Sequence, residues 1–400
     1  GHWPGCWRSR RYAGRVLVPL TNTPRDYAWG STTLIAELEG RTPTGAPEAE
    51  VWFGDHPGHP ARVPDGRTLG EWLASADAPE GTPERLPYLL KILAAGSPLS
   101  IQAHPSKAQA EEGFAREEAA GTPRDAATRT YRDANHKPEI IVALSDRFLA
   151  LAGLRELAAT RRLLDAVGEA TAPLRAVLDS HPDDADALAA ALIWILSPAA
   201  GAQVSEIIAA ATDAASDEFG DELELVRHLQ SHYPGDPGIV VAMLLNLVIL
   251  RRGQGVFVPA GVLHAYIEGL GVEIMAASDN VLRGGLTPKH IDVAELTAIL
   301  DPRPGPAPVL DPAAGTARTF TGGVPDFVLT QVTADPSAAV EVRMNGIAIA
   351  VATSGEVEIT GADTQDRLTL RPGSAALITP NEGSVSISGS GEAFIAEPGQ

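Results

Sequence analysis

The sequence predicts a mainly β protein that carries a helical insert, and the period of its apolar residues supplies most of the evidence. Residues 154–252 repeat apolar positions about every 3.6 residues, which is typical of helices, whereas the flanking regions contain short apolar runs of strand type. Residues 325–400 alternate short strands with glycine turns, a spacing typical of a small β-sandwich or jelly roll. Because 400 residues exceed one ordinary core, we expect two or three packed units.

The expected elements follow from local composition and spacing. Before the insert we expect strands and short helices, the strands at residues 15–20, 100–103 and 140–143 and the helices at 68–74 and 107–120. In the insert we expect helices at 154–178, 183–196, 202–215, 221–232 and 239–250, the last being the longest apolar run. After it we expect strands at 255–259 and 271–276, a helix at 289–299, and strands at 327–332, 347–351, 357–359, 368–370, 375–378 and 385–387.

These elements group into domains. Residues 16–153 and 253–300 form one β domain that is interrupted by the insert at 154–252. Residues 301–324 contain a proline-rich stretch and are expected to be a linker, followed by a second β domain at 325–400. Residues 1–15 contain a basic run but no chemical motif, so we expect a disordered tail that is dispensable for activity.

Charge and cysteine content exclude several classes of protein. The formal net charge of −20 repels nucleic acid and anionic membranes, so a pocket for an anionic ligand must be locally positive. Residues 239–250 would span only about 18 Å as a helix, short of the roughly 30 Å core of a bilayer. Cys6 is the single cysteine, which excludes an internal disulfide and a cysteine zinc cluster and indicates a cytoplasmic protein.

Three segments offer ligands for a metal ion. Gln102 and His104 would share one face of a strand, Glu139 stands where a polar loop enters an apolar strand, and His264 follows a strand and a Pro-Ala-Gly turn. Taken singly, each has a simpler interpretation: Gln102 and His104 as solvated strand residues, Glu139 as an exposed turn residue and His264 as a hydrogen-bonded core histidine. Together they supply two imidazoles, a carboxylate and an amide oxygen, a set that suits a catalytic zinc with an open position and also non-haem iron.

Basic residues lie close to these segments in the sequence. Arg283 precedes a glycine pair, which allows the backbone and the guanidinium to approach a ligand closely. Lys91, Lys107 and Lys137 add positive charge near the same motifs. In a chain of net charge −20, this grouping indicates a substrate that carries phosphate, although a solvated surface arginine is the simpler alternative for Arg283.

Together these segments make the chain similar to the type I phosphomannose isomerases over roughly residues 16–300. The matching motifs occur in the family's order at residues 27–31, 49–57, 86–93, 99–105, 135–139, 259–266 and 279–290. The resemblance implies two cupin-like β-sandwich (jelly-roll) domains plus a helical domain. It also implies one Zn²⁺ per chain, held at the positions of Gln102, His104, Glu139 and His264, and places Arg283 in the active site.

The resemblance further implies a zinc-dependent aldose–ketose isomerase that interconverts mannose 6-phosphate and fructose 6-phosphate through a cis-enediol. Arg283 would stabilise negative charge, and His136 and Lys137 are candidates for proton transfer. The remaining candidates contact the sugar phosphate: Lys91, Ser100, Lys107, Glu50 and Trp29. We expect a monomer with a small-molecule partner. A non-haem iron dioxygenase and a non-catalytic sugar-phosphate-binding protein are the alternatives.

Overall fold

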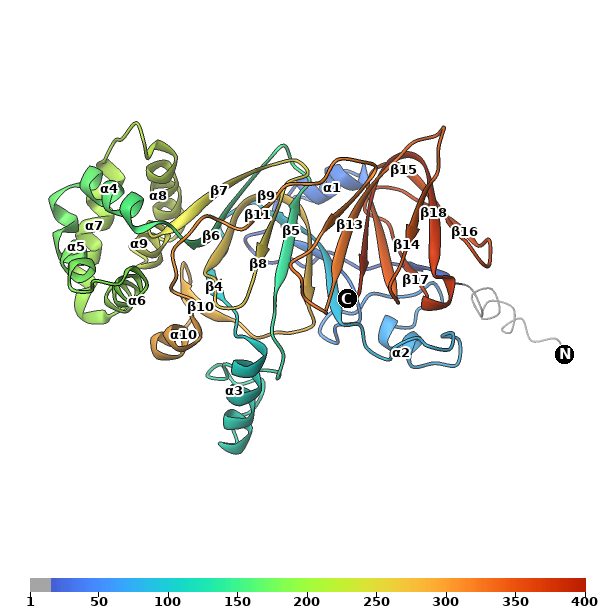
Figure 1. Ribbon diagram of the computed structural model, residues 1–400, viewed down its shortest axis with the longest axis horizontal. Coiled ribbons are helices and arrows are strands. Elements are labelled where there is room, and N and C mark those ends of the chain that lie inside the picture. Colours follow the sequence, from blue (N-terminus) through green and yellow to red (C-terminus); the bar gives the residue numbers. More distant parts are fainter. Residues whose placement is uncertain (1–15) are drawn as a thin grey trace.

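The computed structural model describes residues 16–400 and arranges them as three parts in a row (Figure 1). A group of helices occupies one end, a ten-stranded sheet the middle, and an eight-stranded sheet the other end. The predicted fold class, a mainly β protein with a helical insert, is confirmed. The expectation of a dispensable tail concerns residues 1–15, which lie outside the described residues.

The ten-stranded sheet is organised around one long strand, β9 (His264–Ala276). The first half of β9 pairs with β4 and β6, and its second half pairs with β3 and β5. The other strands of this sheet are β2 (Glu50–Phe53), β3 (Tyr88–Ala95), β4 (Ile101–Ala103), β5 (Glu139–Ala143), β6 (Arg147–Leu154), β7 (Leu245–Arg251), β8 (Gly255–Val258), β10 (Leu282–Gly285) and β11 (Val309–Leu310). Because β9 has partners on both edges at both ends, side chains from four strands meet around it.

Strands β3, β5 and β9 are buried on both faces. In β5, Ile140 and Val142 belong to the apolar core that the two sheets share, whereas Ile141 and Ala143 belong to a separate core inside the ten-stranded sheet. Successive side chains of a strand point to opposite faces. Glu139 therefore points with Ile141 toward the inside of the first sheet.

The eight-stranded sheet includes a strand from the beginning of the chain. Its members are β1 (Leu17–Leu20), β12 (Ala317–Phe320), β13 (Val328–Ala334), β14 (Val340–Arg343), β15 (Ala348–Gly361), β16 (Arg367–Leu370), β17 (Ala375–Ile378) and β18 (Ser384–Glu397). The assignment of the first strand to the first domain is wrong, since β1 pairs with β17. The expected linker at residues 301–324 contains β11 and β12, and the two strands expected at 347–351 and 357–359 are parts of β15.

The insert contains helices in the expected segments up to residue 242, although two helices replace the single one expected at 154–178, and it ends in a strand. Its helices are α4 (Leu157–Val167), α5 (Ala172–Asp179), α6 (Asp184–Ile195), α7 (Gly201–Asp213), α8 (Gly220–His232) and α9 (Gly238–Ala242). The helix expected at 239–250 is wrong, because β7 takes over from Leu245 and pairs with β6. An unbroken apolar run has no periodicity that distinguishes a helix from a strand. Residues 245–251 form a strand because they can pair with the edge of β6.

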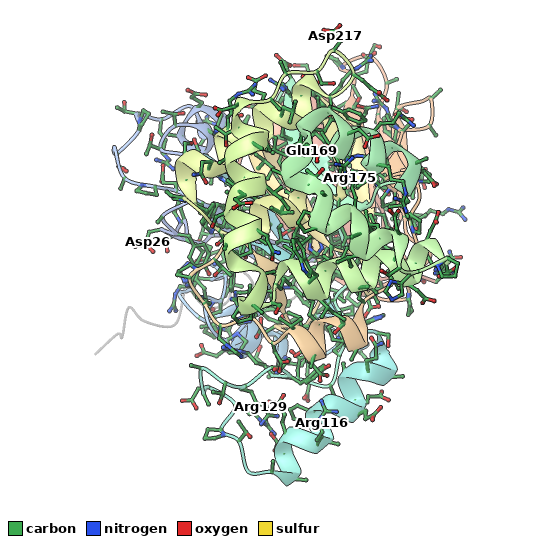
Figure 2. All side chains as sticks on the ribbon, turned by 90° about the vertical axis from the view of Figure 1, so that its left-hand side faces the viewer. Asp26, Arg116, Arg129, Glu169, Arg175 and Asp217 are labelled. Atoms are coloured by element: carbon green, nitrogen blue, oxygen red, sulfur yellow. The ribbon has the colours of Figure 1, made fainter. Side chains whose placement is uncertain are left out.

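Four further helices lie outside the insert: α1 (Leu34–Glu39), α2 (Leu69–Leu73), α3 (Lys107–Ala119) and α10 (Val293–Ile299). Helix α3 projects from the molecule, and Figure 2 shows Arg116 and Arg129 beside it, away from the insert. Arg129 is buried and donates to the Tyr131 carbonyl at 2.6 Å. Among residues 16–400, no single helix is long and apolar enough to cross a membrane. Helix α6 and the helical segment after it reach that length and hydropathy only when they are counted together, and they are bent by 78° relative to each other.

Candidate active site

Three metal-ligand candidates converge at one end of β9. Glu139 begins β5, His264 begins β9, and His104 directly follows β4. One ligand atom from each lies within 4.8 Å of the other two, and the residues are only 1–4% exposed. The antiparallel pairing of β4 and β5 with β9 brings these chain positions together.

Backbone hydrogen bonds fix the two imidazoles with their Nε2 atoms facing Glu139. The His104 Nδ1–H donates to the Asn280 carbonyl at 2.7 Å, and the His264 Nδ1–H donates to the Val262 carbonyl at 2.9 Å. Their Nε2 atoms then carry lone pairs and lie 3.2 and 3.3 Å from the Glu139 carboxylate oxygens.

This arrangement of lone pairs calls for a cation. Burial lowers the pKa of His104 to about 4, so its ring is neutral, and its buried Nε2 has no hydrogen-bond partner among the described residues. Neutral ring nitrogens that face a buried carboxylate are left uncompensated without a positive charge between them. The donor set of His104, Glu139 and His264 therefore fits a divalent metal ion.

Gln102 is the fourth expected ligand, and the sheet register places it beside the other three. It stands opposite His264 on one neighbouring strand and opposite Arg283 on the other. Its amide N–H donates to Ser100 Oγ at 3.3 Å. This bond leaves the amide oxygen of Gln102 as a possible metal ligand.

The candidate metal centre borders an inner cavity of about 150 Å³, which adjoins an outer cavity of about 440 Å³. Glu50, Lys91, Ser100, Gln102 and Lys137 line both. The inner cavity is completed by groups that include Glu139, His264, Tyr266 and Glu273. The outer one is completed by groups that include Tyr27, Trp29, Trp52, Tyr233, Asp279, Arg283, Thr287 and Lys289. The combined space accommodates a small polar molecule.

A buried ion pair forms one wall of both cavities. Lys91 Nζ lies 2.9 Å from Glu50 Oε2 and 4.7 Å from the centre of the Trp52 ring, and Trp52 Nε1 donates to the same Glu50 oxygen at 3.0 Å. Burial alone would lower the pKa of Lys91, but Glu50 and Glu273 outweigh it and the net shift is upward. Lys91 is therefore an ammonium group.

Glu273 is a buried carboxyl group that faces the same space. It stands opposite Lys91 in the β3–β9 register and is 3% exposed. Burial, and then the charge of Glu139, raise the pKa of Glu273 to about 8, although Lys91 acts in the opposite direction. A carboxyl group with such a pKa can exchange a proton near neutral pH.

A group of cations lies at the outer cavity. Arg283 has no ion-pair partner within residues 16–400. Burial and the neighbouring Arg132 lower the pKa of Arg283, and Arg283 is in turn the largest cause of a lowered pKa at Lys289. Cations that repel each other in this way create a favourable site for an anion.

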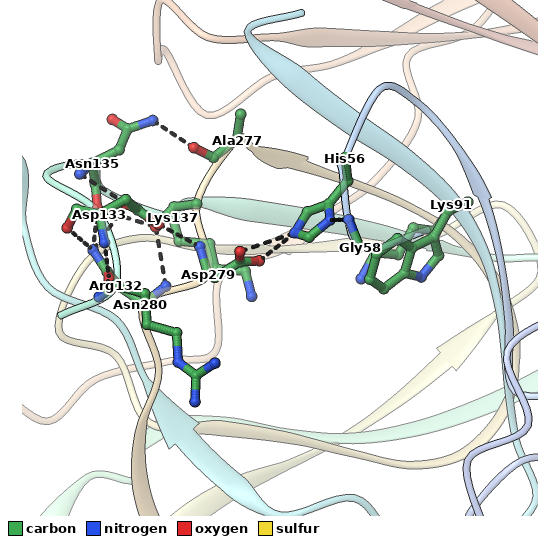
Figure 3. A network of polar contacts seen from close by, with 12 residues as sticks. His56, Gly58, Lys91, Arg132, Asp133, Asn135, Lys137, Ala277, Asp279 and Asn280 are labelled. Carbon is green, nitrogen blue, oxygen red and sulfur yellow. Dashed lines mark hydrogen bonds and ion pairs between the residues drawn. The ribbon is translucent and has the colours of Figure 1, made fainter. Parts of the chain in front are cut away.

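A hydrogen-bond network around Asn280 and Asp279 holds the wall of the outer cavity (Figure 3). The buried Asn280 side chain accepts from the backbone N–H of Arg132 at 2.8 Å and donates to the Asp133 carbonyl at 2.8 Å. The Asn280 carbonyl is the partner of His104. In the same network, His56 Nε2 donates to Asp279 at 2.8 and 2.9 Å, which fixes a carboxylate at the edge of the outer cavity.

The structure brings most of the sequence-predicted site residues together. The four expected metal ligands border or lie beside the inner cavity, and six further candidates line one or both cavities: Glu50, Lys91, Ser100, Lys137, Trp29 and Arg283.

Two predicted residues are not brought to the cavities. His136 Nε2 lies 2.6 Å from Asp326 Oδ1, a carboxylate that precedes β13, and Lys107 Nζ donates to Asn135 at an exposed position. Lys107 begins the projecting helix α3, and residues 135–138 form a loop without strand alternation, so sequence position did not reveal where these side chains point.

The cavity residues that sequence reasoning missed include four with a polar or charged group: Tyr233, Glu273, Asp279 and Lys289. A signal existed for three of them. Glu273 is a charged residue inside an otherwise apolar strand, and Asp279 and Lys289 flank the Arg283 segment. Tyr233 lies in the insert and carries no local signal of this kind.

Comparisons with known proteins agree with this geometry. Residues 17–157 match the family described as phosphomannose isomerase type I, catalytic domain. The mannose-6-phosphate isomerase of Salmonella typhimurium is 37% identical, over 94% of this chain and 98% of that protein, and the human enzyme of that name is 32% identical, over 92% and 94%.

Solved structures show the same likeness. A crystal structure of zinc-bound mannose 6-phosphate isomerase superposes with a TM-score of 0.86 at 34% identity, covering 96% of this chain and 100% of that one. The Salmonella typhimurium enzyme bound to its substrate and a zinc atom gives a TM-score of 0.87 with the same coverage and identity. By sequence over most of its length and by fold, this chain belongs to the type I phosphomannose isomerase family.

Proposed function

We propose that this chain is a mannose-6-phosphate isomerase that holds one zinc ion through Gln102, His104, Glu139 and His264. The observation that carries the proposal is the convergence of three buried electron-pair donors beside a cavity whose outer end contains free cations. When bound, zinc supplies a Lewis acid that orients and polarises the oxygens of the sugar. The relatives named above, one of them solved with zinc and its substrate, support the same assignment.

The outer cations are suited to the phosphate group of the substrate. Arg283 and Arg132 lower the pKa of Lys289, and burial together with Arg132 lowers the pKa of Arg283, so a phosphate dianion would relieve the repulsion among these cations. Arg283 lines the outer cavity and not the inner one, and we therefore assign it to the phosphate rather than to the enediolate. The stacked rings of Tyr27 and Trp29 also line the outer cavity and offer an apolar surface to the sugar.

Proton transfer between C1 and C2 needs a group that borders the inner cavity and titrates near neutral pH. Glu273 satisfies both conditions, and Lys137 lines the same inner cavity, with its Nζ 3.8 Å from Glu139 Oε1. Lys91 keeps its proton and is suited to stabilise negative charge on the enediolate. We assign the proton transfer to Glu273 and Lys137, in place of His136, which contacts Asp326 instead.

The test is an isomerase assay combined with metal analysis. Protein purified without added metal should contain zinc, should lose mannose-6-phosphate isomerase activity on treatment with a chelator, and should regain it with zinc. Full activity in protein shown to be metal-free would refute the proposal. Iron as the native metal, with oxygen consumption and no isomerase activity, would favour the dioxygenase alternative, and substrate binding without turnover would favour a binding protein.

Three broader properties belong to the same proposal. We describe the two β units as cupin-like because each strand group encloses its own apolar core, around Ala150 in the first and Ala350 in the second. We expect the chain to be monomeric, which sedimentation analysis tests directly. A cytoplasmic location is consistent with the single cysteine, and fractionation of cells tests it.

A further inference from the structure

The insert contacts the active site through Asp236, which lies between α8 and α9. The Asp236 carboxylate accepts three backbone N–H groups. Its Oδ1 accepts from Gly238 at 2.7 Å and from Leu286 at 3.0 Å, and its Oδ2 accepts from Thr287 at 3.1 Å. One side chain of the insert therefore holds the segment that follows β10, about fifty residues later in the chain.

The segment it holds has an unusual backbone. The register of β10 shifts between Arg283 and Gly285, Gly285 has a φ of 132°, and Leu286 has a φ of 55°. A leucine in the left-handed region persists only when its surroundings impose that conformation. Gly238 packs so closely behind it that an added Cβ would lie 2.4 Å from the Leu286 nitrogen. The N-terminus of α9 and the Asp236 carboxylate together impose this path.

This path determines where two cations point. Arg283 precedes the bend and Lys289 follows it, and both line the outer cavity, as do Leu286 and Thr287 between them. The insert also supplies Tyr233 to the same cavity, where its hydroxyl donates to the Pro98 carbonyl at 2.5 Å. The insert is thus a wall of the ligand site as well as a neighbouring helical unit.

We propose that Asp236 is a positioning residue for anion recognition, which acts by fixing the 285–289 segment so that Arg283 and Lys289 face the phosphate of the substrate. The inference rests on the proposed function for the identity of the ligand. Asp236 lines neither cavity and does not touch the substrate space, so its effect must pass through the two cations.

The experiment replaces Asp236→Asn, which keeps the shape of the side chain but replaces an acceptor oxygen with a donor. Two constants are measured: KM for mannose 6-phosphate, and the dissociation constant of inorganic phosphate by calorimetry. Both should rise in parallel by about tenfold while kcat changes less than about threefold, because a phosphate contact binds ground and transition states alike. Zinc content should stay at the wild-type level.

The matched control is Asp183→Asn in the same insert. Asp183 caps α6 by accepting the Asp186 N–H at 2.9 Å and lines neither cavity. Because Asn caps a helix about as well as Asp, this substitution should change neither the melting temperature by much nor either constant. Asp236→Glu keeps a charged acceptor and serves as the milder variant if Asp236→Asn does not fold. We expect a smaller rise in both constants for it.

A third variant tests the route of the effect. In a Lys289→Gln background, Asp236→Asn should raise KM and the phosphate dissociation constant by a smaller factor than it does in the wild type. The reason is that the effects of residues that act through one another are not additive. Unchanged phosphate binding and KM in a folded Asp236 variant would overturn the inference and leave the isomerase proposal intact. Wild-type protein that binds phosphate but lacks isomerase activity would refute the proposed function, and the phosphate titrations would still decide the role of Asp236.

Discussion

Removing the buried ammonium group of the active site should destabilise the whole molecule. We consider Lys91→Met, which keeps most of the apolar stem and deletes the charge. In the wild type, Lys91 is 8% exposed and Glu50 is 6% exposed, and their charged atoms lie 2.9 Å apart. Glu273 stands opposite Lys91 on β9. The variant therefore leaves two buried carboxyl groups without their cation.

The expected loss of stability can be estimated. Deleting one partner of a buried ion pair costs about 3–5 kcal/mol, because the other charge stays buried without compensation. An unfolding entropy of about 2.1 cal/mol/K per residue, applied to a chain of this length, converts that loss into a decrease in melting temperature of about 4–6 °C. Lys107→Met is the control, since Lys107 is exposed and makes a single contact with Asn135, and we expect a change within about 0.5 kcal/mol.

A double-mutant cycle isolates the interaction between the two groups. Thermal unfolding is measured for Lys91→Met, for Glu50→Gln and for the double variant, all in the metal-free state so that zinc binding does not add to stability. The double variant should be clearly more stable than the sum of the single losses predicts. The reasoning fails if Lys91→Met costs less than about 1 kcal/mol, or if the two losses simply add.

Three further predictions concern the roles of single groups. Arg283→Ala should raise KM at least about tenfold with a smaller loss of kcat, and a fall of kcat at constant KM would show instead that Arg283 stabilises the enediolate. Lys289→Ala should raise KM in the same way, whereas Lys107→Ala, outside the cavities, should leave KM unchanged in the same steady-state assay. Glu273→Gln should abolish turnover. It should also remove a pH dependence of stability, because the folded wild type keeps the Glu273 proton up to about pH 8 and the unfolded chain releases it near 4.5. Relative to the Gln variant, the unfolding free energy of the metal-free wild type should therefore fall with rising pH by up to about 1.4 kcal/mol per unit, and parallel curves in denaturant titrations would contradict this.

The convergence of the candidate metal ligands could be predicted from the sequence because local rules determine the directions of these side chains. Strand alternation puts Gln102 on the face it shares with the donors, and Glu139 and His264 are the first residues of their strands. The direction of a side chain at such a position can be predicted once the strand and its first residue are known. The same rules fail for His136, which lies in a loop where no period relates its direction to that of Glu139.

Other features depend on contacts that no local pattern contains. The apolar run at residues 239–250 becomes a short helix and then β7, because β6 offers it an edge to pair with. Burial and then the charge of Glu139 on β5 raise the pKa of Glu273, and both effects depend on the pairing of β9 with β3 and β5. The contact between Asp236 and Thr287 joins residues far apart in the chain, and each looks like an ordinary loop residue in isolation.

The metal donors and the outer cations are held in place by different parts of the molecule. The metal donors and the pair of Lys91 and Glu50 come from strands that pair directly around β9, so their geometry belongs to the core of the first sheet. The cations come instead from a bent segment whose path is imposed by Asp236 and Gly238 of the insert. Changes at Asp236 or Gly238 should therefore weaken substrate binding while the metal centre and proton transfer remain intact. Changes in the sheet should instead disturb metal content, stability and turnover together.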